Sequence, residues 1–389
     1  MKNRLYDATK IDWDNLMFST KELWMLLIPI MVEQMLNSLM GMADTMMVSN
    51  VGSVAMSAVS LVDSINTLVV QVFAALATGA AIICSHYLGK GDERGANKAA
   101  RQIFLTVIVI SLTITAGGLI FCRPLLRLIF GAVEPAVMED SIIYFLITAS
   151  SYPFIALFNA GGAFYRAGGN SKFPMQISII SNVLNIIGNA VLIFGCDMGV
   201  AGAAISTLVS RVFCAIVVLF FLRKPKQKIV LDQYHTIRPD FPLIGKILAI
   251  GIPAGVENGM FQFGKLAIQS TVSTLGTQAI AAQAMTVIFE NVNGIAAIAV
   301  GIGLMTVAGQ AFGAGRKEEA KYYIIKLTGY AEIVLIISCA VTFLISRLIM
   351  HLAGMEAESM ELCYQMLIAI TIAKPIFCAT PFLPSNIML

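Results

Sequence analysis

Charge is scarce in this sequence, and its scarcity excludes a soluble globular protein. Only 13% of the 389 residues are Asp, Glu, Lys or Arg, whereas 58% are hydrophobic, and the mean hydropathy is +0.81. A soluble chain of this length needs about 25% charged residues to cover its surface. Long apolar runs take their place. The sequence therefore predicts an all-α polytopic membrane protein whose immediate partner is the lipid bilayer.

The residues that carry most enzyme chemistry are also few. The three histidines do not pair at metal-ligand spacing, and the seven cysteines are scattered, odd in number and without a C-x-x-C pair. No Ser/His/Asp set, H-E-x-x-H or closely paired acids appear, which disfavours a membrane-embedded enzyme. "GKGD" at 89–92 lacks the Lys-Ser or Lys-Thr of a phosphate loop, and its repeat partner "GAGR" indicates a helix C-cap and turn. We expect no ATP site, no cofactor and no nucleic-acid partner.

Ten apolar runs are long enough to cross a bilayer as helices, which takes about 20 residues each. No signal peptide precedes them, because the first 22 residues are polar and the apolar run that follows is too long for one. The predicted spans are 23–48, 56–84, 99–121, 140–163, 173–194, 200–222, 246–272, 279–307, 322–346 and 360–380.

The basic residues predict the orientation of these spans. With the N-terminus inside, the cytoplasmic segments and the adjoining helix ends hold 20 of the 26 Lys and Arg residues, and the outer connections hold three. Such a bias places the N-terminus in the cytoplasm, and we expect a multi-pass protein of the bacterial inner membrane. The basic stretch at 223–241 is then a cytoplasmic linker.

The chain repeats itself at a spacing of 224 residues. Without a gap, 14 of the 68 residues in 29–96 match 253–320, including Pro29 with Pro253 and Glu33 with Glu257. Four glycines also match, and a similar hydrophobic composition of the two segments does not explain these matches. The copies begin six spans apart, so both enter the membrane in the same direction. The sequence therefore predicts two parallel helix-bundle lobes with the substrate between them.

The predicted parts are unequal. They are a cytoplasmic tail (1–22), an N-lobe of six spans (23–222), a cytoplasmic linker (223–245) and a C-lobe of four spans (246–389). The second copy matches only the first four spans of the first copy. We expect the C-lobe to be either truncated or degenerate, and a non-transporting remnant is one reading of that expectation.

The first and fifth spans carry polar stripes that need a reason inside a bilayer. Glu33 and Asp44 are 11 residues apart, about three turns, and so share one helix face. Asn182, Asn185 and Asn189 likewise share a face of the fifth span. These amides either ligate a cation or bond neighbouring helices to one another. Asp44 is the stronger functional candidate, since Glu33 lies nearer the cytoplasmic end and recurs in the repeat.

Further polar groups extend this picture to the other spans. Ser206, Thr207 and Arg211 lie in the sixth span, with Arg211 expected near the cytoplasmic third and able to pair with a carboxylate. The second lobe adds two acids and two bases, which suggests mutual pairing, because lone charges would neutralise. These four residues, which with Glu33 are candidates for the cavity or a second coupling site, are Glu257, Lys265, Glu290 and Lys374.

At this point the chain resembles a known family. "PIMVEQMLNSLMGMADTMMVSNVGSVAMSAVSL", "GAAIICSHYLGKGD", "FYRAGGNSKFPM" and "GIPAGVENGMFQFGK" are together similar to the multidrug and toxic compound extrusion (MATE) family. The resemblance implies two six-helix lobes and antiport of drugs against H⁺ or Na⁺. It implies a role in ion coupling for Asp44, with Asn185 and Thr207 as partners. Asn189 stands where many members have Asp, and Lys374 where some relatives have an acid.

The function expected on these grounds is that of a secondary antiporter, not an enzyme, acting as a monomer on small lipophilic cations. The coupling ion is H⁺ or Na⁺. If it is Na⁺, the expected ligands are Asp44, Asn185 and Asn189. One alternative is a lipid-linked oligosaccharide flippase of similar architecture. Its cavity should be basic to hold pyrophosphate, and only Arg211, Lys265 and Lys374 supply charge of that sign.

Overall fold

The computed structural model is built from helices, and these lie where the apolar runs predict them. It describes residues 6–130, 134–225, 227–231, 238–273, 277–352 and 357–378. A short 3₁₀ turn, η1 (Ala8–Lys10), and a π-helical turn, η2 (Ala190–Gly195), accompany the α-helices. The α-helices of the described residues are α1 (Thr20–Ser49), α2 (Ser53–Gly89), α3 (Glu93–Ile120), α4 (Cys122–Phe130), α5 (Pro135–Ser150), α6 (Tyr152–Ala167), α7 (Lys172–Asn189), α8 (Gly199–Leu222), α9 (Phe241–Ser273), α10 (Thr277–Gly313), α11 (Lys317–Leu352) and α12 (Ala357–Cys378).

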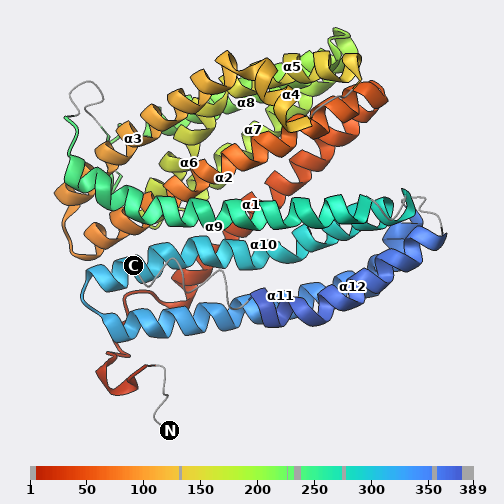
Figure 1. Ribbon diagram of the computed structural model, residues 1–389. Helices are drawn as coiled ribbons and strands as arrows, with labels where there is room; N and C mark the ends of the chain where they lie inside the picture. The colour runs from red at the N-terminus through yellow and green to blue at the C-terminus, as the bar shows by residue number, and fades with distance from the viewer. Residues whose placement is uncertain are drawn as a thin grey trace.

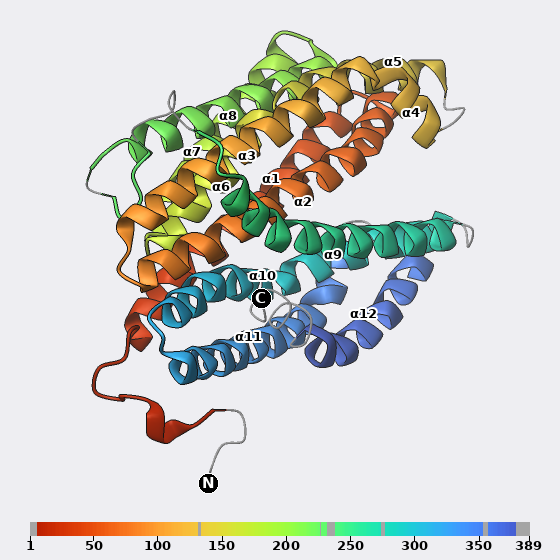
Figure 2. The same cartoon turned by 60° about the vertical axis from the view of Figure 1, so that its left-hand side comes forward.

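The helices form two bundles stacked one above the other (Figure 1). Helices α2–α8 lie in the upper bundle in that view and α9–α12 in the lower one, with α9 running along the boundary between them. Helix α1 runs from the lower bundle, where its first half packs against α10 and α11, up into the upper one. The turned view of Figure 2 shows the same division. The two-lobe membrane fold predicted from the repeat is therefore confirmed.

Seven described helices are long and apolar enough to span a membrane, and the α5–α6 pair makes an eighth if it counts as one span. Ten spans were predicted. The two that fall short correspond to α9, which carries Glu257 and Lys265, and α12, which carries Lys374. This count covers the described residues only, and both helices pack against α10 like the other members of their bundle.

The fourth predicted span, 140–163, is wrong as a single helix. It is two helices, α5 and α6, bent by 42° between Ser150 and Tyr152. Pro153 lies at the start of α6, where proline is tolerated because its missing N–H has no helical partner there. The short helix α4 before α5 was also not predicted.

Pseudosymmetric glycines bring the two bundles together where α2 crosses α10. Gly89 of α2 faces the carbonyl of Gln310, and Gly313 of α10 faces the carbonyl of His86, so closely that a Cβ on either glycine would collide. Each partner is the other's counterpart at the 224-residue spacing. The glycines of the repeat thus mark a backbone contact between the lobes.

The turns that follow this crossing confirm the interpretation of "GKGD" and "GAGR" as helix caps. Gly91 and Gly315 have φ angles of 73° and 77°, in the left-handed region that favours glycine. In both turns the N–H of the next residue bonds back to the helix, Asp92 to Tyr87 O and Arg316 to Ala311 O at 3.0 and 2.9 Å. This is the bonding of a Schellman cap.

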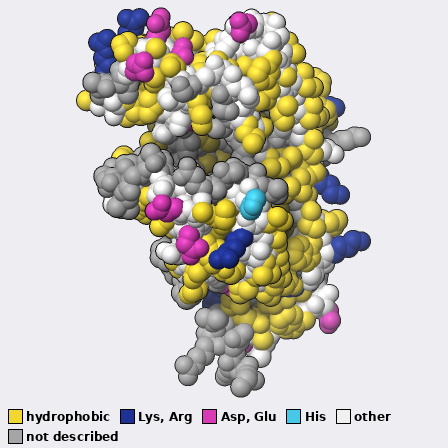
Figure 3. All heavy atoms as spheres, turned by 90° about the vertical axis from the view of Figure 1, so that its right-hand side faces the viewer, with side chains coloured by type: hydrophobic (Ala, Val, Ile, Leu, Met, Phe, Trp, Pro, Cys, Tyr) yellow, Lys and Arg dark blue, Asp and Glu magenta, His cyan; other side chains and the backbone are white. Residues whose placement is uncertain are grey.

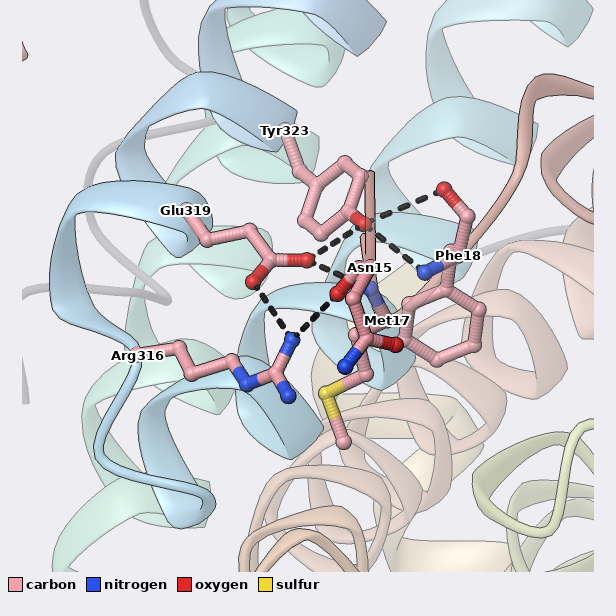
Figure 4. Close-up of polar contacts among 6 residues, drawn as sticks. All are labelled: Asn15, Met17, Phe18, Arg316, Glu319 and Tyr323. Carbon is pink, nitrogen blue, oxygen red and sulfur yellow. Dashed lines mark hydrogen bonds and ion pairs between the residues drawn. The ribbon is translucent and has the colours of Figure 1, made fainter. Parts of the chain in front are cut away.

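The segment that precedes α1 is bound by the start of α11, in the other bundle. Figure 4 draws the six residues involved: Asn15, Met17, Phe18, Arg316, Glu319 and Tyr323. Glu319 Oε1 accepts from the Met17 N–H at 2.6 Å, and Tyr323 Oη accepts from the Phe18 N–H at 2.8 Å. Arg316 donates to the Asn15 carbonyl and pairs with Glu319. The N-terminal segment is thus bonded to the C-lobe rather than left loose.

The linker before α9 is held by the N-lobe in the reciprocal way. Gln102 of α3 accepts from the Asp240 N–H at 2.9 Å and donates to the Arg238 carbonyl at 2.8 Å. Lys98, one turn earlier, pairs with the Asp240 carboxylate at 2.6 Å. Each lobe's third helix therefore binds the segment that leads into the other lobe's first helix, α3 on one side and α11 on the other.

Candidate functional site

Asp44 lies in the second half of α1 and is bonded to the asparagine stripe of α7. Asn189 donates from Nδ2 to Asp44 Oδ1 at 2.5 Å and contacts Asn185 Oδ1 at 3.3 Å. Asn185 in turn donates to Thr207 of α8 at 3.3 Å. The structure therefore brings the four residues named from the sequence as coupling candidates into one connected chain across three helices.

This chain contains an oxygen atom with no hydrogen bond. Asn189 is fully buried, and its Oδ1 finds no hydrogen-bond partner among the residues that the structure describes. A buried polar atom left unpaired costs about 1–3 kcal/mol, so such an atom calls for a ligand or water. Carboxylate and amide oxygens are the ligands that hard cations such as Na⁺ prefer. Asp44, Asn185 and Asn189 therefore fit the Na⁺ set named from the sequence, and Asp44 alone could hold a proton.

A second carboxylate, which sequence reasoning missed, lies in the same bundle. Asp63 of α2 accepts at Oδ1 from Asn66 Nδ2 at 3.1 Å and from Tyr144 Oη at 3.2 Å. Tyr152 Oη donates to Asn66 Oδ1 at 2.7 Å. The signal was present, because Asp63 is the only acid between residues 56 and 84 and an ionisable residue inside a span always needs a reason.

The sequence predicted Arg211 near the cytoplasmic third of its span. In the structure it lies midway along α8 instead. Its Nη1 donates to Ser151 Oγ at 2.7 Å, at the bend between α5 and α6. It makes no ion pair shorter than 4 Å with a carboxylate among the described residues. Its charge nevertheless acts on both Asp44 and Asp63. The expected pairing with a carboxylate is therefore electrostatic and not a direct contact.

Glu33 has a different standing from Asp44. It is 4% exposed and pairs with Arg166, from the end of α6, at 3.2 Å. Arg166 is itself largely buried, with 11% of its side chain exposed. The pair joins α1 to α6 and neutralises both charges, so the geometry favours a structural role for Glu33.

In the second bundle, three of the four candidates from the sequence come together. Lys265 of α9 lies 3.5 Å from the Glu290 carboxylate of α10, and Lys374 of α12 donates to the Glu290 carbonyl at 2.5 Å. The expected pairing of an acid with a base is found for Lys265 and Glu290, whereas Lys374 bonds the backbone of Glu290 and not its carboxylate. Glu257 is exposed on α9.

The surface is hollowed between the two bundles at the end of the molecule away from the N-terminal segment. Figure 3 views that end and shows an indentation between the upper and lower halves, with hydrophobic side chains prominent around it. The α2–α10 glycine crossing and the bonded segments before α1 and α9 lie at the opposite end, on the left in Figure 1. The lobes are therefore joined at one end and separated at the other.

Comparison with known proteins gives a consistent result. A model of the MatE family matches residues 29–191 and 253–385. An uncharacterized transporter, YisQ of Bacillus subtilis (strain 168), is 30% identical over 272 residues, which are 69% of this chain and 59% of that protein. The probable multidrug resistance protein NorM of Thermotoga maritima is 28% identical over 307 residues, 77% of this chain and 64% of that protein. The chain thus spans about three fifths of the length of these two relatives.

Solved structures show the same fold. A multidrug resistance transporter of the MOP superfamily in its outward-facing conformation aligns over 94% of this chain and 82% of its own length. The TM-score is 0.87 and the sequence identity 20%. A related structure in a bent conformation aligns over 95% of this chain and 85% of its own, with a TM-score of 0.83 at 20% identity.

Proposed function

The chain belongs to the multidrug and toxic compound extrusion (MATE) family of transporters, and from this premise we propose that it is a secondary active antiporter. It exports lipophilic, cationic drugs or toxic metabolites in exchange for H⁺ or Na⁺. We place it in the bacterial inner membrane as a monomer with the N-terminus in the cytoplasm. The basic bias of the predicted cytoplasmic segments supports that orientation.

One observation carries the proposal: a carboxylate in a membrane-spanning helix is bonded to amides rather than to a cation. Asp44 receives its hydrogen bond from Asn189, whose second polar atom is buried and unpartnered. An anion in such a place costs several kcal/mol unless a counter-charge is supplied. An ion that arrives and leaves supplies that charge reversibly, whereas a fixed lysine or arginine would supply it permanently, as Arg166 does for Glu33.

The arrangement of the lobes supports alternating access driven from this site. The hollow between the lobes, at the end away from the glycine crossing, would face outward in the proposed orientation. A proton or Na⁺ that enters there reaches Asp44 and neutralises it. Because neutralisation changes the relative free energy of the open and closed states, it shifts their populations. Closure of the N-lobe then expels the substrate held between the lobes.

The flippase alternative finds less support. Its cavity needs free positive charge to hold pyrophosphate, but Lys265 is paired with the Glu290 carboxylate. Arg211 lies with two carboxylates in the N-lobe. The ionised groups of the described lobes are therefore suited to cations more than to a phosphorylated lipid.

Ethidium efflux from a pump-deficient bacterial strain tests the proposal. Cells that express the chain should retain less ethidium than cells with an empty vector. Asp44→Asn should remove the difference, because the amide cannot take up and release a charge. Asp14→Asn, in the exposed N-terminal segment, is the matched control and should export like the wild type. Equal efflux by the Asp44→Asn variant at equal expression would sink the coupling role, and no efflux by any form would sink the export function.

A further inference from the structure

Two carboxylates and one guanidinium lie together among the described residues of the N-lobe interior, apart from the Glu33–Arg166 pair. They are Asp44 of α1, Asp63 of α2 and Arg211 of α8. Hydrogen bonds through Asn189 and Asn185 connect Asp44 to Thr207, which lies one turn before Arg211 on α8. Arg211 donates to Ser151, and the next residue, Tyr152, bonds Asn66 beside Asp63.

The other titratable groups of the described residues that feel these charges are Tyr144 of α5, Tyr152 of α6 and Cys214 of α8. Both tyrosines are neutral when they act as donors. The cluster therefore contains two potential negative charges and one fixed positive charge.

The hydrogen bonds around Asp63 are oriented to hold it as an anion. Tyr152 donates to Asn66, and Asn66 and Tyr144 both donate to Asp63 Oδ1. An ionised carboxylate only accepts hydrogen bonds, so donors that converge on it favour the charged form. Asn66 and both tyrosines are at most 6% exposed, which fixes these donors in place.

Arg211 is anchored by a serine and forms no direct ion pair with a carboxylate among the described residues. Its Nη1 donates to Ser151 Oγ, and the Ser151 hydroxyl donates in turn to the Thr148 carbonyl at 2.5 Å. Ser151 is fully buried at the α5–α6 bend. Neutral groups thus anchor the guanidinium, and its positive charge is left to balance one of two carboxylates.

The charges sum to one excess negative charge, which the interior of a membrane protein does not tolerate without compensation. The same cluster offers the unpartnered Asn189 Oδ1 as a ligand beside Asp44. We propose that Asp63 is a second coupling carboxylate, and that Asp44, Asp63 and Arg211 act as one unit that binds a single proton or monovalent cation in each transport cycle. This inference rests on the proposed antiport function and adds its stoichiometry.

Charge counting gives a distinct expectation for each variant. Asp63→Asn leaves one carboxylate and one guanidinium, so the unit becomes neutral and should no longer bind the ion. Arg211→Gln leaves two carboxylates, so ion binding should rise about twofold. The double variant Asp63→Asn/Arg211→Gln restores one excess negative charge, now on Asp44 alone. It should therefore bind one ion again, a recovery that a merely structural Asp63 would not produce.

The test is an ion count on the full chain purified in detergent. Acid–base titration against a detergent blank counts bound protons, and equilibrium binding of radioactive Na⁺ counts sodium. The expected counts relative to wild type are none for Asp63→Asn, about double for Arg211→Gln and unchanged for the double variant. Asp14→Asn, exposed and remote, serves as the control for loss of a carboxylate. Tyr144→Phe keeps the charges and should change affinity but not the count.

Two outcomes overturn the inference. One is an ion count in Asp63→Asn equal to that of wild type, which would leave Asp44 as the coupling group by itself. The other is a folded double variant, judged by gel filtration, that binds no ion. Both readings concern ion binding in purified protein, so they stand even if ethidium proves not to be exported, an outcome that would count against the proposed substrate instead.

Discussion

At the level of single residues, the two acids of α1 differ in what surrounds them. Glu33 is paired with a buried arginine, whereas Asp44 is bonded to asparagine. Both are carboxylates in one membrane helix, so composition and spacing alone do not separate them. What separates them is whether an arginine contacts the carboxylate directly, and for Glu33 that arginine is 133 positions away in the sequence.

Glu33→Gln tests the structural role of this pair. It leaves Arg166 buried without a counter-charge, which typically lowers the free energy of unfolding by about 3–5 kcal/mol. Replacing both residues, as Glu33→Leu with Arg166→Met, should recover most of that loss. Denaturant unfolding in mixed micelles measures both changes, and the ion count of the folded Glu33→Gln protein should match wild type. A stable Glu33→Gln variant with an altered ion count would instead assign Glu33 to coupling.

The sequence predicted part of the site and not the rest, for physical reasons. Asn185 and Asn189 are four residues apart, so their spacing predicts that they share one helix face. A membrane helix has few polar groups, which makes such a pair easy to recognise. Asp63 stands alone in its span, and its partners Tyr144 and Tyr152 come from two other helices. Their meeting depends on how α2, α5 and α6 pack, which no local pattern states.

At the level of elements, the bend between α5 and α6 shows what hydropathy does not reveal. Residues 140–163 are apolar enough to read as one span, but the chain turns by 42° at Ser151. The bend places the Ser151 hydroxyl where Arg211 donates to it. The mean hydropathy of a segment does not change when one helical turn is broken, so this bend could be found only from the packed structure.

The crossing of α2 and α10 predicts the effect of a side chain at Gly89. Gly89→Leu should drive the two helices apart, because its side chain would meet the backbone of Gln310. Cys84, one turn away and fully buried, should then react with a maleimide, and peptide mass mapping locates the label. Gly117→Leu is the matched control, since nothing lies within 4 Å of that glycine. Unchanged labelling in Gly89→Leu would contradict the proposed contact between the lobes.

The linker before α9 predicts a dependence of stability on pH. The Lys98 hydrogen bond and charge lower the pKa of Asp240 below its ordinary value. A group whose pKa is lowered by folding stabilises the protein above its unfolded pKa, about 3.9 for Asp, and loses this effect as pH falls through the folded pKa. The melting temperature of Asp240→Asn should therefore lie below that of wild type at neutral pH and converge with it in acid.

Lys98→Met provides the control for that measurement. With its cation partner removed, the Asp240→Asn change should shift the melting temperature much less at neutral pH. A shift of equal size in both backgrounds would mean that the Asp240 contact to the Leu243 N–H, and not the ion pair with Lys98, gives the stabilisation.

At the level of the whole molecule, the repeat predicted two lobes, and the structure shows how they are joined. The matched glycines meet at the α2–α10 crossing, and the segments before α1 and α9 are each bound by the opposite lobe. These contacts gather at one end, whereas the surface is hollowed between the lobes at the other (Figure 3). The duplication was readable from sequence because Pro, Glu and Gly rarely match by chance, but the reciprocal binding of the two segments was not.

If ion binding in the N-lobe drives export, the purified and reconstituted protein must carry out uphill transport that depends on Asp44. Ethidium is followed in proteoliposomes under an imposed H⁺ or Na⁺ gradient, with wild type and Asp44→Asn side by side. We expect wild type to move ethidium against its own gradient, and Asp44→Asn to carry it at most to equal concentrations on both sides. Accumulation by Asp44→Asn to the wild-type level would contradict the claim.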